Sequence, residues 1–177
     1  VGGTGHAVQN ASVHCSITGG ASNPVTNCTS AHIGGGTSNT ITGATNAAVV
    51  GGASHAIAST ATRAVVLGGN TNTTSAPDSA ILCGLTGTIE AACTGAVIAG
   101  GSGNQIKNSA SPVGRVAPNS RYCLVSGDRV SITGSDSSLA TGVRSYITDS
   151  PFSAIFATND LNGLVGASGI TGQGYVS

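Results

Sequence analysis

Branched aliphatic residues return along this chain every 15 to 17 residues, each time at a fixed distance from a pair of glycines. The glycine pairs begin at Gly2, Gly19, Gly35, Gly51, Gly68 and Gly100, and Cys83-Gly84 fills the one gap. From Gly19 onward a branched residue lies two positions before each pair, and a small residue lies two positions before that. The branched residues are Ile17, Ile33, Val49, Val66, Ile81 and Ile98, and the small ones are Cys15, Ala31, Ala47, Ala64, Ser79 and Ala96. Because alternate residues of a strand share one face, both columns are predicted to point inward.

A second apolar column lies six residues after the first glycine. It comprises Val8, Val25, Ile41, Ile57, Thr74, Ile89 and Ile106, and only Thr74 breaks it. No stripe with helical spacing is present, and glycine at this density is incompatible with helices, where each one costs about 1 kcal/mol. The pattern therefore predicts an all-β fold: a parallel β-roll or β-helix solenoid with coils of 16 or 17 residues and two short strands per coil.

The regularity of the repeat divides the chain into four parts. Residues 1–106 are predicted to form the regular solenoid, and residues 107–120 an inserted loop that contains Pro112 and Pro118. Residues 121–164 are expected to continue the solenoid in degenerate form. There Leu124 with Ile132, and Leu139 with Ile147, are predicted to restore the two inward columns. Residues 165–177 lack the pattern and are expected to form a tail or cap.

Composition limits the possible functions. Only 3% of the residues are aromatic and 7% charged, and the formal net charge is zero, so nothing indicates binding to nucleic acid. No apolar run approaches the roughly 18 residues of a membrane helix, so membrane insertion is not expected. The chain begins without methionine, inside a coil, and we interpret it as part of something longer.

A polar column lies four residues after the first glycine of each pair. It consists of His6, Asn23, Asn39, His55, Asn72, Gly87 and Asn104. We predict a structural ladder in which these side chains bond to neighbouring coils and supply the turn conformation. A metal site is not expected, because His6 and His55 are three coils apart, about 14 Å.

The five cysteines are not expected to form disulfides within the chain. Cys28 and Cys93 occupy similar corners four coils apart, about 19 Å, whereas a disulfide needs α-carbons within about 7 Å. Cys15 belongs to the inward column, and the partner of Cys123, if it has one, cannot be placed.

The segments HIGGGTSNTITGATNAAVVGGASHAI and AVVLGGNTNTTSAPDSAILCG resemble the head repeats of trimeric autotransporter adhesins and related repeats of phage and large DNA virus fibres. The resemblance covers residues 1–106 well and 124–147 weakly. It implies a side-by-side homotrimer whose chains bury their apolar columns against one another, and a role in attachment to host surfaces. Those heads have shorter coils, and free thiols favour assembly in a reducing cytosol, which favours a viral fibre.

We therefore expect a structural and adhesive module, on a virion surface or extracellular, that binds host-surface glycan or receptor without a cofactor. Loops on rigid scaffolds often carry binding residues, so the candidate site comprises Arg115, Arg121 and Tyr122. The alternative for these residues is that they only seal a trimer.

Two other functions remain open. A polysaccharide lyase or hydrolase could use Asp128, Asp136, Asp149 and Asp160 beside Arg129 and Arg144, although their spacing gives no support. Ice binding is ranked last, because Thr37, Thr40, Thr42 and Thr45 are expected to lack aligned counterparts on successive coils.

Overall fold

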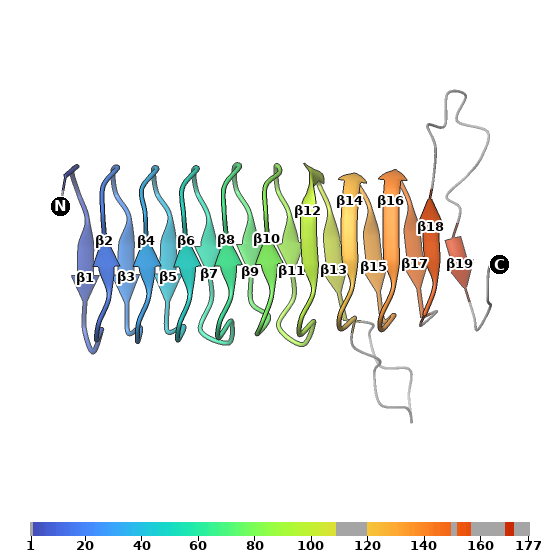
Figure 1. Cartoon of the computed structure of the whole chain (residues 1–177), viewed down its shortest axis with the longest axis horizontal. Coiled ribbons are helices and arrows are strands. Elements are labelled where there is room, and N and C mark those ends of the chain that lie inside the picture. Colours follow the sequence, from blue (N-terminus) through green and yellow to red (C-terminus); the bar gives the residue numbers. More distant parts are fainter. Residues whose placement is uncertain (1, 109–119, 150–151, 157–168, 172–177) are drawn as a thin grey trace.

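The chain is a β-solenoid in which every strand pairs in parallel with the strand one coil away (Figure 1). The computed structural model describes residues 2–108, 120–149, 152–156 and 169–171. The odd-numbered strands form one sheet: β1 (Ala7–Gln9), β3 (Pro24–Thr26), β5 (Thr40–Thr42), β7 (Ala56–Ile57), β9 (Thr73–Thr74), β11 (Thr88–Ile89), β13 (Gln105–Lys107), β15 (Ser131–Thr133), β17 (Tyr146–Thr148) and β19 (Gly169–Thr171). The even-numbered strands form the other: β2 (Ser16–Ile17), β4 (His32–Ile33), β6 (Ala48–Val49), β8 (Val65–Val66), β10 (Ala80–Ile81), β12 (Val97–Ser102), β14 (Leu124–Asp128), β16 (Leu139–Val143) and β18 (Ala154–Phe156). We call them the odd sheet and the even sheet.

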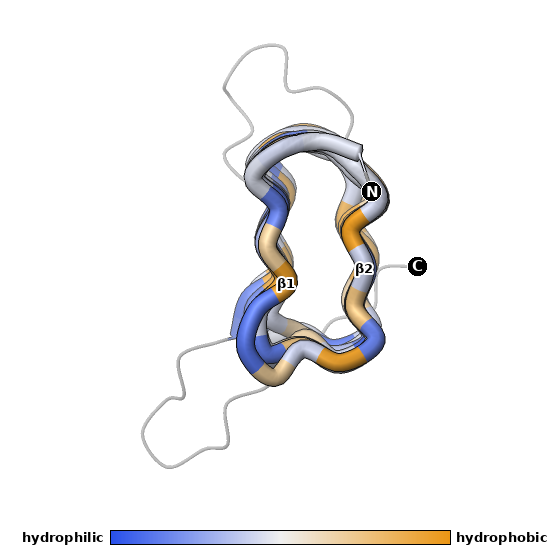
Figure 2. The backbone as a smooth tube through the Cα atoms, turned by 90° about the vertical axis from the view of Figure 1, so that its left-hand side faces the viewer, coloured by the Kyte–Doolittle hydropathy of each residue, from blue (hydrophilic) through white to orange (hydrophobic). Residues whose placement is uncertain are grey.

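The two sheets face each other across a narrow core, visible along the axis in Figure 2. The predicted inward columns fill this core: Ile33, Val49, Val66 and Ile81 of the even sheet are fully buried, as are Ile41 and Ile89 of the odd sheet. Val8 is 49% exposed because β1 has a neighbour on one side only. The predicted parallel solenoid is therefore confirmed, and a single chain buries these columns without a partner.

The two polar residues that interrupt the apolar columns form a hydrogen bond with each other. Thr74 and Ser79 are both buried, and their hydroxyl oxygens lie 2.6 Å apart. The Ser79 hydroxyl is also within 2.8 Å of the Ala76 carbonyl. Buried hydroxyls need such partners, so the core accepts this pair without an orphaned polar group.

The register after the insertion differs from the prediction by one residue. Ile98 pairs with Val125 and Gly100 with Ser126, so Ala99 has no counterpart in β14. Val125 and Ala140 consequently point inward and are fully buried, whereas Leu124 is 41% exposed and pairs with Leu139. The prediction that Leu124 and Leu139 lie in the inward column is wrong, while Ile132 and Ile147 are buried as expected.

The stack continues on both sides of the insertion. β14 pairs with β12 and β15 with β13, although residues 109–119 lie outside the described residues. The Ser120 hydroxyl donates to the carbonyl of Lys107 across the two ends of the insertion, at 2.7 Å. Near the C-terminus β19 pairs with β17 in the odd sheet. Within the described residues there is no helix that could cross a membrane.

The polar column forms the predicted ladder. The Asn23 and Asn39 side-chain oxygens accept the backbone N–H of Asn39 and His55 at 2.9 and 3.0 Å. Asn39 also donates its amide to the carbonyls of Gly35 and Gly52 at 2.9 and 3.1 Å. The asparagines do not supply the turn conformation, however. The left-handed backbone is adopted by the residue before each, as at Ser38, where φ is 57°.

His55 takes an asparagine's place in this ladder and is 1% exposed. Its Nδ1 accepts the N–H of Asn72 at 3.1 Å, which requires the neutral imidazole. Its Nε2 makes no hydrogen bond of ordinary geometry, although the backbones of Gly69 and Gly51 lie beside the ring. Burial lowers the pKa of His55, and these backbone groups only partly oppose that shift.

His55→Asn is expected to make stability less sensitive to acid. In the wild type, unfolded chains take up a proton on His55 as the pH falls below about 6.5, while the folded chain resists it, so stability is lost on acidification. An amide at this position stays neutral and can reach both glycine carbonyls as Asn39 does. Thermal midpoints at pH 7 and pH 5 measure the difference. His14→Asn, at an exposed corner, is the control and should keep the wild-type slope; equal slopes for all three proteins would contradict the prediction.

Candidate functional site

The aromatic side chains of the described residues all lie outside the core. Tyr122 is 66% exposed, Tyr146 40%, Phe152 71% and Phe156 73%. The largest fully buried side chains are instead isoleucine, valine and His55. Aromatic residues normally supply a large part of core burial, so exposed rings concentrated in the last coils of the rod require another explanation.

Two of these rings stand on one corner of the solenoid, which we call the Tyr122 ridge. The ridge consists of the residue preceding the small inward residue of each coil: His14, Ser30, Asn46, Arg63, Asp78, Gly95, Tyr122, Ser137 and Phe152. Every member has a left-handed backbone, with φ between 52° and 69°. Such a conformation is uncommon for tyrosine and phenylalanine, and here it turns both rings outward at the corner.

The ring of Tyr122 lies over Gly95, the ridge residue of the preceding coil. A Cβ at Gly95 would lie 2.6 Å from Cδ1 of Tyr122 and 2.9 Å from Cε1. The Tyr122 N–H also donates to the Thr94 carbonyl at 2.9 Å. Because Gly95 has no side chain, the Tyr122 ring can pack against the ridge at this position.

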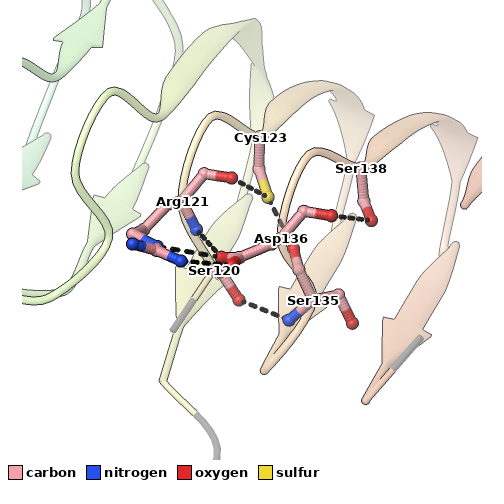
Figure 3. A network of polar contacts seen from close by, with 6 residues as sticks. All are labelled: Ser120, Arg121, Cys123, Ser135, Asp136 and Ser138. Carbon is pink, nitrogen blue, oxygen red and sulfur yellow. Dashed lines mark hydrogen bonds and ion pairs between the residues drawn. The ribbon is translucent and has the colours of Figure 1, made fainter. Parts of the chain in front are cut away.

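Arg121 and Asp136 form an ion pair beside the ridge, on adjacent coils (Figure 3). The guanidinium donates through Nη2 to Oδ2 of Asp136 at 2.7 Å and through Nε to Oδ1 at 3.3 Å. The Arg121 backbone N–H adds a third bond to Oδ1 at 2.9 Å. Burial favours a raised pKa for Asp136, but the hydrogen bonds and charge of Arg121 outweigh it and lower the pKa below its usual value.

Of the three predicted site residues, the structure places Arg121 and Tyr122 next to each other on the outer surface. Arg115 lies outside the described residues. The sequence-based choice missed Asp136 as the partner of Arg121, and it missed Phe152 as the second ring of the ridge. Both could have been identified from the coil length, because residues 15 positions apart in this part of the chain lie next to each other on adjacent coils.

The outer face of the even sheet carries apolar side chains over successive coils. After Ser16 and His32 in the first two coils, one outward column contains Ala48, Val65, Ala80, Val97, Leu124, Leu139 and Ala154. After Thr18 and Gly34, the other contains Val50, Leu67, Leu82 and Ala99. Val50, Leu67 and Leu82 are 53%, 43% and 41% exposed. No Asp, Glu, Lys or Arg occupies these columns, so they form a charge-free apolar strip.

The odd sheet carries many threonines on its outer face. Thr42 pairs with Thr26 on this sheet, and Thr45 pairs with Thr29 in a bridge outside the named strands, so the expectation that these threonines lack aligned counterparts is wrong for two of the four. Thr40 pairs with Ala56, and Thr37 lies between Ala21 and Ala53, as expected. The aligned pairs do not extend into a continuous array, and Glu90 and Lys107 interrupt the face.

Among the residues that the structure describes, these aspartates do not form a catalytic pair. Asp128 ends an even-sheet strand, whereas Asp149 follows an odd-sheet strand at a different corner, and Asp160 lies outside the described residues. Asp136 is held ionised by Arg121, which disfavours a role as general acid, since that role needs a raised pKa. Among the described residues no group of three or more His, Cys, Asp or Glu side chains could hold a metal ion.

The described cysteines are free thiols, as predicted. Burial raises the pKa of Cys93 to about 12 and that of Cys123 to about 11. The Cys123 thiol donates to the Ser135 carbonyl at 2.8 Å (Figure 3). Buried thiols with raised pKa values are poor nucleophiles, so these two are packing residues of the core.

In comparisons with known proteins, no family model, no curated protein and no solved structure matches this chain.

Proposed function

We propose that this chain is a structural and adhesive segment of a fibre or head on the surface of a virion or a cell, which attaches to host-surface glycan or receptor. The observation that carries the proposal is a rod whose described aromatic side chains all lie outside the core. A stack of similar coils gives length and rigidity, because each coil bonds to its neighbours through two parallel ladders. The exposed rings and the Arg121–Asp136 pair give that rod a recognition surface at one end.

The proposal includes a homotrimer of chains packed side by side. The inward columns are already buried within one chain, so an interface between copies has to use other residues. The apolar strip of the even sheet fits that role, because two uncharged apolar faces meet without the cost of desolvating a charge. The coils of a second copy have the same spacing of about 4.8 Å, so side chains on facing strips can interdigitate along the length of the strip.

The mass of the assembly tests the fibre assignment. Light scattering on a sizing column is expected to give three times the 16.9 kDa of the chain. Leu82→Asp places a charge in the apolar strip and should shift the protein to monomer. Thr88→Asp places the same charge on the odd sheet and should leave the trimer intact. A wild-type monomer would contradict the assignment.

The alternative, a virion-associated enzyme that cuts polysaccharide, gains no support from the described carboxylates. Asp136 is held ionised by Arg121, whereas hydrolysis by general acid catalysis requires a carboxyl group with a raised pKa. We therefore favour binding over cleavage.

A further inference from the structure

We propose that the Tyr122 ridge binds an extended, uncharged polysaccharide whose sugar rings stack on Tyr122 and Phe152. This inference rests on the proposed attachment to a surface glycan and names the class of glycan. It is carried by the placement of the two exposed rings on one rigid line, with a self-neutralised ion pair beside them.

The spacing of the two ridge positions that carry the rings is set by the backbone. The Ser137 N–H donates to the Arg121 carbonyl at 2.8 Å, and the Phe152 N–H donates to the Asp136 carbonyl at 2.9 Å. Tyr122 and Phe152 are therefore two coils apart, about 10 Å along the rod axis. This is roughly the length of a disaccharide unit in an extended chain, so every second sugar could meet a ring. Ser137, exposed between them, leaves room for the intervening sugar and offers it a hydroxyl.

The orientation of Tyr122 suits stacking. Its ring is laid against the ridge at Gly95, where a side chain would collide with it. At 66% exposure much of the ring surface remains open to solvent. A tyrosine already held in place loses little conformational entropy on binding, and its apolar face matches the C–H groups of a sugar ring.

The charges beside the ridge favour a neutral ligand. Arg121 is paired with Asp136, and further along the ridge Arg63 is paired with Asp78 through two hydrogen bonds, one of 2.7 Å. An anionic polymer would have to displace these carboxylates or lie beside them. Sugar hydroxyls, in contrast, can bond to the outer edges of a carboxylate and a guanidinium that remain paired.

Affinity electrophoresis of the full chain in gels that contain soluble polysaccharide tests the inference. Neutral β-linked glucan should retard the wild-type protein, and anionic hyaluronan should not. Tyr122→Asn and Phe152→Asn keep a residue that tolerates the left-handed backbone, and each should weaken binding roughly tenfold. Tyr146→Ala removes an exposed ring on the odd sheet, away from the ridge, and should bind as the wild type does.

Each outcome bears on one proposal. Wild-type protein that is not retarded by any of several neutral glucans, mannans and xylans, or ridge variants that bind as tightly as Tyr146→Ala, would overturn this inference. Retardation by hyaluronan alone would also overturn it. A trimer with such results still leaves the fibre assignment standing, because that assignment is tested by mass and not by glycan binding.

Discussion

Replacing Gly36 with alanine is expected to lower the free energy of unfolding by at least about 4 kcal/mol, whereas the same change at the adjacent Gly35 should cost less than about 1 kcal/mol. Gly36 has a φ of 89°, which strains any residue with a side chain. A Cβ there would collide with the Gly52 carbonyl oxygen of the next coil and would lie 2.7 Å from Nδ2 of Asn39. At Gly35 the nearest atom to a Cβ is 3.9 Å away, in ordinary contact.

Urea denaturation followed by circular dichroism compares the two variants under identical conditions. The pair is a matched test, since the substitutions are chemically the same and differ by one position. Equal losses of stability at Gly35 and Gly36 would show that the glycine corners do not stack as closely as described. A loss of stability only in Gly36→Ala would show that the second glycine of each pair is needed for the coils to stack, whereas the first can be replaced.

The solenoid was predictable because inward and outward side chains must alternate along each strand. Ile33 and Ile41 had to share an inward direction with their counterparts in every coil, since a slip of one residue would turn a whole column to solvent. The same rule explains the error at Leu124. Two apolar residues, Leu124 and Val125, stand side by side, and hydrophobicity alone cannot tell which one points inward. The choice depends on the missing counterpart of Ala99, which only the strand register reveals.

The candidate site was predictable in part. Arg121 and Tyr122 stand out because charged and aromatic residues are rare in this chain. Their surroundings depend on which residues stack on the next coil, and this required the register across the insertion. Asp136 lies beside the ridge one coil after Arg121, and Phe152 joins the ridge two coils after Tyr122. In a solenoid, residues one coil apart interact as residues four apart do in a helix.

Asn39→Ala is expected to cost about 3 kcal/mol, a large effect for the loss of one small polar side chain. Asn39 is fully buried, and its side chain makes three hydrogen bonds to the backbone of its own coil and the next. Alanine would leave the His55 N–H without its acceptor at 3.0 Å, inside the corner where water has no access. An unsatisfied buried donor costs more than the bond itself contributed.

Asn70→Ala provides the control, because Asn70 lies exposed on the same turn of a nearby coil and its side-chain partner is the neighbouring Thr71 hydroxyl. That change should alter stability by less than about 0.5 kcal/mol. Thermal and urea denaturation of both variants provide the comparison. If the two variants were equally stable, the ladder would be a consequence of coil stacking and not one of its causes. A loss of stability in Asn39→Ala alone would instead show that the buried amides fix the spacing of successive corners. The same amides would then also set the spacing of the exposed residues on those corners.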